Sequence, residues 1–185
     1  DPEPAPGCIP DMWTGVGRWS DLNTFVNLLS LQPNPATTAA AVPSTGGGAN
    51  EAPYQAPACV ADDANCTNAS NCIVGGVGCV GYRAEAIRIL IQITDADNQC
   101  SGAGCATFTP AFTGTQLITK DIKFVGLYGT GDEGGAGTAQ SVATDLGVAS
   151  NTVDALGQPF VYPALDAAVV PQTVQGVLDL VRGIP

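Results

Sequence analysis

The chain has 185 residues, a formal net charge of −11 and no histidine. This length suits one domain. The six basic residues are scattered along the chain, so the sequence lacks the basic patch that proteins use to bind nucleic acid or anionic membranes. Without histidine, catalytic arrangements that depend on an imidazole base are impossible. We therefore expect a protein that is not an enzyme, and a carboxylate-based hydrolase is the one enzymatic alternative.

The cysteines point to an exported protein held by disulfides. Six of the seven form three close local pairs, which are Cys59 with Cys66, Cys72 with Cys79, and Cys100 with Cys105. Other connectivities stay open, and Cys8 is predicted to be unpaired or to bond to another chain. Zinc is the weaker interpretation, because the chain has no histidine and no closely spaced thiolates of the CxxC kind. Disulfides persist outside the cytosol, so we expect a secreted or cell-surface protein, and no stretch is long enough to span a bilayer.

The amino-terminal part of the chain predicts short elements separated by loops. Residues 1–12 are rich in proline and predict an extended arm. Residues 13–19 predict a short strand or turn, and residues 21–31 and 35–42 predict two short helices. After a glycine-rich loop, Glu51 is expected to start another helix with Pro53 in its first turn. Residues 59–81 form a polar insertion, rich in cysteine and glycine, that we expect on the surface.

Residues 87–97, IRILIQITDAD, predict the central strand. The run is short, apolar and β-branched, which favours a strand covered on both faces. It ends at Thr94, Asp95 and Asp97. In open α/β sheets, ligands bind in the crevice beyond the carboxyl ends of the strands. These three side chains are therefore candidate binding residues.

The remainder of the chain alternates helices and strands. We expect a helix or turn at residues 114–120, a strand at 121–128, a helix at 138–146, a short strand around 160–162 and a closing amphipathic helix at 169–181. This alternation, with continuously apolar strands, predicts an α/β fold. Its sheet would be mostly parallel and covered by helices on both faces.

The order of these pieces resembles the von Willebrand factor A (integrin I-like) domain, in particular its exported bacterial versions with cysteine-rich insertions. The segments that carry the resemblance are GGGANE, the ITDAD that follows the apolar strand, DIKFVGLYG and the closing DAAVVPQTVQGVLDLVRGIP. The resemblance covers roughly residues 13–185, and it implies a Rossmann-like sheet over this range.

The resemblance also implies a metal-ion-dependent adhesion site that holds Mg²⁺ or Ca²⁺. In the family, an Asp-x-Ser-x-Ser motif on the first strand, a loop residue and the aspartate ending the fourth strand supply the ligands. Asp95 matches that aspartate, and Glu51 matches the loop acid of the integrin-β-like branch. Thr94 and Asp97 are expected as further ligands or as supporting groups. Both ions are hard cations that prefer oxygen ligands.

The chain departs from the family pattern at its amino terminus. It contains no Asp-x-Ser-x-Ser motif, and the family's first strand, first helix and second strand have no counterpart before Trp13. The resemblance therefore implies that a missing amino-terminal segment or a second polypeptide completes the sheet. Cys8 is the candidate for a covalent link to it.

Two functions fit these residues. The first is an exported adhesion or protein-interaction module that coordinates a partner's carboxylate through a divalent cation. The alternative is a structural subunit of a surface filament or extracellular matrix, with no working metal site. In both, the partner is another protein or another copy of the chain.

Overall fold

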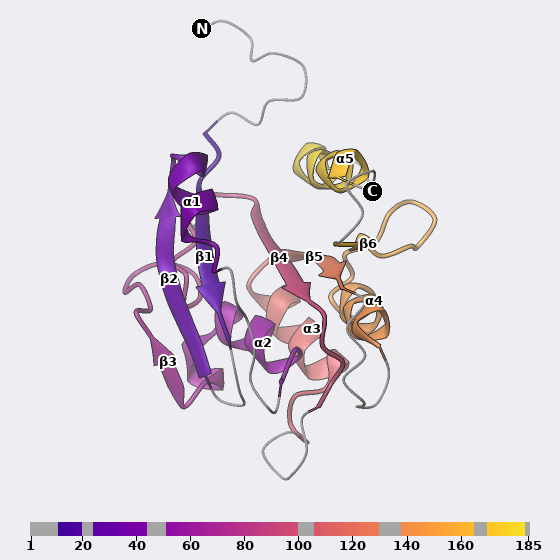
Figure 1. The fold of residues 1–185 in the computed structure, drawn as a ribbon, viewed down its shortest axis with the longest axis horizontal. Coiled ribbons are helices and arrows are strands. Elements are labelled where there is room, and N and C mark those ends of the chain that lie inside the picture. Colours follow the sequence, from indigo (N-terminus) through magenta and orange to yellow (C-terminus); the bar gives the residue numbers. More distant parts are fainter. Residues whose placement is uncertain are drawn as a thin grey trace, which may run out of the picture.

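The computed structural model describes residues 11–19, 24–43, 51–99, 106–129, 138–164 and 170–183. They form a mixed α/β fold with two three-stranded sheets (Figure 1). The first sheet has the order β1 (Thr14–Arg18), β2 (Thr24–Gln32), β3 (Asn68–Ser70), and the second has the order β4 (Arg88–Thr94), β5 (Ile122–Tyr128), β6 (Val161–Pro163). The helices are α1 (Pro35–Ala41), α2 (Gln55–Ala61), the 3-10 turn η1 (Asp63–Asn65), α3 (Pro110–Thr119), α4 (Ala139–Ala149) and α5 (Val170–Arg182).

The second sheet is parallel throughout, as the alternation of strands and helices predicts. β4 pairs with β5 along its whole length, from Arg88 opposite Ile122 to Thr94 opposite Tyr128. β5 also pairs in parallel with β6. Helix α4 packs closely on β5, since a Cβ atom added at Gly126 would lie 2.7 Å from the Cβ of Ala143.

The hydrophobic core of this half is built on β5. Phe124 and Val125 are fully buried. Their neighbours in the core come from α3 and α4, and they include Leu117, Val142 and Leu146. Burial of large apolar side chains is the dominant favourable contribution to folding, so the packing of α3 and α4 on β5 stabilises this half of the molecule.

The expectation that residues 87–97 form a strand is confirmed, but the expectation that both its faces are covered is wrong. β4 buries Arg88, Gln92 and Thr94, whereas Ile91 is 44% exposed and Ile93 is 57% exposed. β4 lies at the edge of its sheet, so one side of the strand has no described neighbour. Ile91 and Ile93 share one face of the strand, and this face is the exposed one.

The buried polar side chains of β4 reach backbone carbonyls, which explains how they are tolerated inside. Arg88 donates to the carbonyl oxygens of Arg83, Ala84 and Lys120. Gln92 Nε2 donates to the carbonyl oxygen of Pro53 over 2.8 Å. Through this bond β4 is attached to the segment that leads into α2.

The first sheet corrects one sequence expectation and confirms two. Residues 21–31 were expected to be helical, but β2 occupies Thr24–Gln32 and pairs antiparallel with β1. The alternation of a buried Phe25 and Asn27 with more exposed neighbours is the period of a half-buried strand, which overrides the helical spacing. The strand expected at residues 13–19 is present as β1, and α1 begins at Pro35, where Asn34 caps its amino end.

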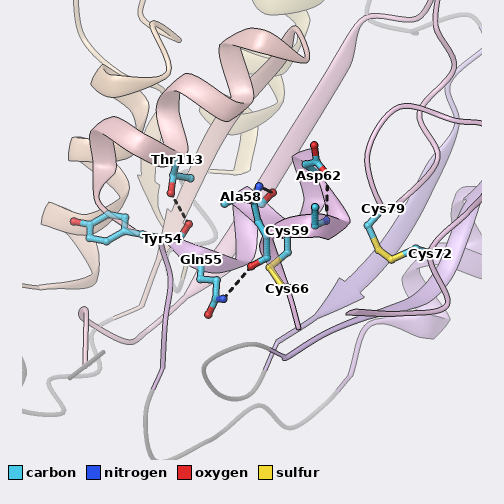
Figure 2. The surroundings of a disulfide bond; sticks show 11 residues. Tyr54, Gln55, Ala58, Cys59, Asp62, Cys66, Cys72, Cys79 and Thr113 are labelled. Atoms are coloured by element: carbon cyan, nitrogen blue, oxygen red, sulfur yellow. Dashed lines mark hydrogen bonds between the residues drawn. A yellow bond between two sulfur atoms is a disulfide. The ribbon is translucent and has the colours of Figure 1, made fainter. Parts of the chain in front are cut away.

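Two of the three predicted disulfides are present, and Cys59–Cys66 and Cys72–Cys79 lie close together in the fold (Figure 2). The expectation that residues 59–81 form a surface insertion is wrong in part. Cys59, Cys66 and Cys79 belong to the hydrophobic core, and β3 joins the first sheet by pairing in parallel with β2. Cys8, Cys100 and Cys105 lie outside the described residues, as does most of the predicted amino-terminal arm.

Candidate functional site

The carboxyl end of β4 is held in a defined conformation by backbone hydrogen bonds. The Thr94 hydroxyl accepts from the backbone N–H of Ala96 over 3.1 Å, and the Thr94 carbonyl oxygen accepts from the N–H of Gly129 over 2.8 Å. Gly129 follows β5 and approaches so closely that a Cβ there would lie 2.7 Å from the Cβ of Asp95. The ends of the two parallel strands are therefore in contact.

Asp97 is the most informative side chain at this edge. It is only 1% exposed, and neither of its carboxylate oxygens has a hydrogen-bond partner among the described residues. A buried carboxylate is costly unless it is paired or coordinates a metal ion. Asp95, two residues earlier, is exposed. Asp97 thus supplies two buried oxygens that a cation can use, and Asp95 supplies an accessible carboxylate in the same turn.

The predicted ligand set is only partly assembled. Thr94, Asp95 and Asp97 follow one another at the end of β4, but no three Cys, Asp or Glu side chains within the described ranges gather into a group that could hold a metal ion. Glu51 lies before Tyr54, the residue that precedes α2, and not in the first turn of that helix as expected. The chemistry of Asp97 fits a hard cation, and further ligands have to come from outside this group.

An apolar groove between the two sheets is the second candidate site. The cavity has a volume of about 640 Å³, and it runs along β1 on one side and β4 on the other. Its other walls come from β2, α2 and α5, and from residues between Ile73 and Ile87 that precede β4. Sequence reasoning missed this groove. The available signal was the strict alternation of isoleucine with Arg88, Leu90 and Gln92, which marks a strand with two different faces.

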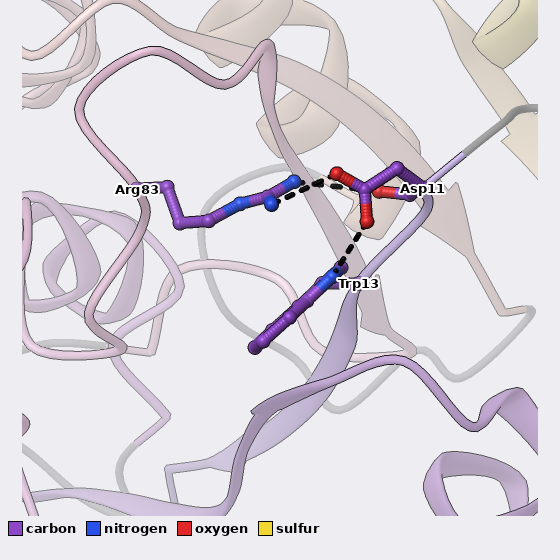
Figure 3. Close-up of polar contacts among 3 residues, drawn as sticks. All are labelled: Asp11, Trp13 and Arg83. Atoms are coloured by element: carbon purple, nitrogen blue, oxygen red, sulfur yellow. Dashed lines mark hydrogen bonds and ion pairs between the residues drawn. The ribbon is translucent and has the colours of Figure 1, made fainter.

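Asp11, Trp13 and Arg83, which are among the residues that line the groove, form a polar cluster (Figure 3). Arg83 forms an ion pair of 2.9 Å with Asp11 and lies over the Trp13 ring at 5.0 Å from its centre. Trp13 Nε1 donates to the Asp11 carboxylate over 3.0 Å. Hydrogen bonds from Arg83 and Trp13 hold the pKa of Asp11 below its ordinary value. The cluster connects the residues before β1 with the residues before β4, so it ties the two sheets together at their amino ends.

Two buried polar atoms on the groove walls have no hydrogen-bond partner among the described residues. They are Nε1 of Trp19, just after β1, and Oε1 of Gln92, on β4. Another wall residue, Tyr82, donates its hydroxyl to the carbonyl oxygen of Ile89 over 3.2 Å, and burial raises the pKa of this hydroxyl. The groove therefore carries one donor and one acceptor that the described chain leaves unused.

Comparison with known proteins gives no family. No family model matches this chain, and no curated protein matches it either. The von Willebrand A resemblance accordingly stays a prediction. Among the described helices, none combines the length and the apolar character needed to cross a bilayer.

Proposed function

We propose that this chain is an exported protein-interaction module that binds a divalent cation and, through it, a carboxylate of a partner protein. The cation would lie at the carboxyl end of β4. Asp97 would hold it, with Asp95 and Thr94 beside it and with further oxygens from outside the described residues. Mg²⁺ or Ca²⁺ suits such an oxygen set, and a bound cation can accept a carboxylate from a partner at an open coordination position.

The buried carboxylate of Asp97 carries the proposal. Leaving a buried charged group unsatisfied costs more than the roughly 1–3 kcal/mol estimated for a neutral polar group. Both carboxylate oxygens of Asp97 are buried and have no hydrogen-bond partner among the described residues. A cation removes the penalty, since it supplies the opposite charge and the missing contacts. The net charge of −11 also favours the approach of cations over anions.

The disulfides support the exported location that this function needs. Cys59–Cys66 and Cys72–Cys79 are formed in the structure. Bonds of this kind are typical of proteins that work outside the cytosol.

The test compares thermal unfolding of the wild type, Asp97→Asn and Asp63→Asn with Ca²⁺, with Mg²⁺ and with EDTA. Asp63→Asn is the matched control, because it removes the same charge from an exposed position in η1. In EDTA we expect Asp97→Asn to be more stable than the wild type, because an unpaired buried charge costs more than the neutral amide that replaces it.

With either cation, the wild type and Asp63→Asn should gain stability, whereas Asp97→Asn should not. Isothermal titration calorimetry gives the affinity directly. An equal cation response of Asp97→Asn and the wild type would remove Asp97 from the site. No response in any of the three proteins would refute the cation site altogether.

The apolar groove favours the alternative function, a structural subunit of a surface filament or extracellular matrix. Apolar patches that stay exposed mark protein interfaces, and such an interface needs no cation. Assembly of the chain into larger particles in EDTA, followed by light scattering, would support this alternative over cation-mediated binding.

A further inference from the structure

The groove lies between two strand edges that the described chain leaves open. β1 is the outer strand of its sheet and pairs only with β2 among the described strands. β4 is the outer strand of the other sheet and pairs only with β5. Unpaired strand edges present rows of backbone N–H and C=O groups that form a template for another strand. Here two such edges border one cavity.

The walls of the groove have the character of a sheet interior. Ala56, Pro57 and Val60 of α2 contribute one part, and Val177 and Val181 of α5 contribute another. A strand between helices in an α/β fold is covered on both faces and is apolar along its length. The groove offers this environment, but no described strand occupies it.

The two wall atoms without a hydrogen-bond partner indicate which polar groups a bound ligand must carry. The indole N–H of Trp19 can donate to a carbonyl oxygen, and Gln92 Oε1 can accept from an N–H. An extended backbone carries both groups. A ligand made only of apolar atoms would leave both wall atoms unsatisfied, at a cost in affinity.

The charges around the groove define the occupant further. Asp11 and Arg83 are the charged residues among those lining the cavity, and they are paired with each other. The central part of the occupant is therefore uncharged. Residues 1–10 of this chain are a poor match, because prolines at positions 2, 4, 6 and 10 lack the N–H that an inner strand must donate.

The geometry points to an open strand position: we propose that an extended, apolar segment of a partner polypeptide inserts between β1 and β4 and joins the two sheets into one. β1 and β4 run in the same direction (Figure 1), so the inserted strand is parallel to both or antiparallel to both. β1 has five residues and β4 has seven. At about 3.3 Å per residue, an insert of this size spans roughly 17–23 Å.

The experiment uses a synthetic peptide with seven central valine, isoleucine and leucine residues, lysines at both ends for solubility and an amidated carboxyl terminus. Binding to the full chain is measured by fluorescence anisotropy in EDTA. These conditions exclude cation and carboxylate, so the result is independent of the proposed function. The matched control peptide has N-methyl groups on alternate central residues, which removes backbone donors and leaves the side chains unchanged.

We expect the unmethylated peptide to bind at least tenfold more tightly than its methylated control. Ile87→Lys should weaken binding at least tenfold, and Ile118→Lys should not change it. The two isoleucines are 55% and 53% exposed, and Ile87 alone belongs to the groove. Amide hydrogen exchange should slow in both β1 and β4 when the peptide binds.

Three results would overturn the proposal. Equal binding of both peptides would mean that the groove takes apolar groups without pairing strands. Absence of binding would mean that the groove is closed to an extended segment. A dimer of the chain that excludes the peptide and dissociates in Ile87→Lys would assign the groove to a second copy.

Discussion

β4 and β5 are neighbouring parallel strands of equal length, but they differ in what surrounds them. β5 pairs on both edges and contributes Phe124 and Val125 to the core. β4 pairs on one edge, carries its isoleucines on a face that is exposed, and borders an apolar cavity. The composition of β4 suits the interior as well as that of β5 does. β4 therefore has the apolar sequence of an inner strand, although it lies at the edge of its sheet.

The largest expected contrast is between Phe124→Ala on β5 and Ile91→Ala on β4. Phe124 is 0% exposed, so its truncation should cost about 3–5 kcal/mol in the free energy of unfolding. Ile91 is partly exposed, and its truncation should cost about 1 kcal/mol or less. Urea unfolding followed by tryptophan fluorescence measures both values. Similar losses for the two variants would mean that β4 is as well packed as β5 and that the comparison fails.

The two disulfides are expected to give the next largest effect. Both pairs have a sequence separation of 7, and a loop of this size predicts about 2.5 kcal/mol of stabilisation through the unfolded chain for each. Cys59 and Cys66 are both buried, whereas Cys72 is only partly so. Replacing Cys59 and Cys66 by alanine should therefore destabilise more than replacing Cys72 and Cys79, since cavities add to the loss.

Urea unfolding of the two double variants, each compared with the oxidised wild type, measures both losses in the free energy of unfolding. Equal losses would show that only the loop closure matters. A larger loss for Cys72 and Cys79 would contradict the packing argument.

Particular residues show how far the sequence alone predicts this molecule. The runs around β4 and β5, the closing helix α5 and two disulfide pairs follow from local pattern, because periodicity and spacing decide them. β2 does not, since TFVNLLSL fits a helical spacing and its pairing with β1 and β3 is a tertiary effect. The burial of Cys59 inside α2 depends on the same long-range packing.

The candidate sites divide in the same way. The position of Thr94, Asp95 and Asp97 at a strand end follows from the sequence. The isolation of the Asp97 carboxylate does not, because it depends on which groups the fold leaves around it. The groove could not be predicted from the sequence either, since β1 and β4, which border it, lie far apart along the chain.

A third prediction joins the open edge of β4 to the cation. A strand that enters the groove parallel to β4 would end at the same edge as Asp97, where residues that follow it can supply oxygens. The affinity for Ca²⁺ should then rise when the inserted segment is followed by serine and aspartate residues. A coupling of roughly 5- to 150-fold is typical of linked sites. Calorimetry measures the Ca²⁺ affinity in the presence of that peptide, and a shorter peptide without the polar tail is the control. Equal Ca²⁺ affinities with the two peptides would show that the groove and the cation site are not coupled.

The smallest expected effect is the pH dependence of stability that arises from Tyr54 and Tyr82, two tyrosines near β4. The carbonyl oxygen of Pro53 accepts a hydrogen bond from Gln92 of β4. The carbonyl oxygen of the next residue, Tyr54, accepts from the Thr113 hydroxyl of α3 over 2.7 Å. Burial, with a smaller contribution from the charge of Asp145, raises the pKa of the Tyr54 hydroxyl to about 12. Burial likewise raises the pKa of Tyr82, which donates to Ile89 of β4.

The direction of the pH effect follows from these shifts. Between the ordinary tyrosine pKa of about 10 and the folded value of about 12 for Tyr54, the unfolded chain has lost the proton while the folded chain retains it. Unfolding is then favoured by each increase in pH, so the stabilisation is complete below pH 10 and is lost as pH rises toward 12. Tyr54→Phe should flatten this decline, and at pH 7 it should lose only what the hydroxyl contributes through its hydrogen bond with Asp145. Urea midpoints at pH 7, 10 and 11 test it, and an unchanged slope in the variant would show that Tyr54 does not report on the packing beneath β4.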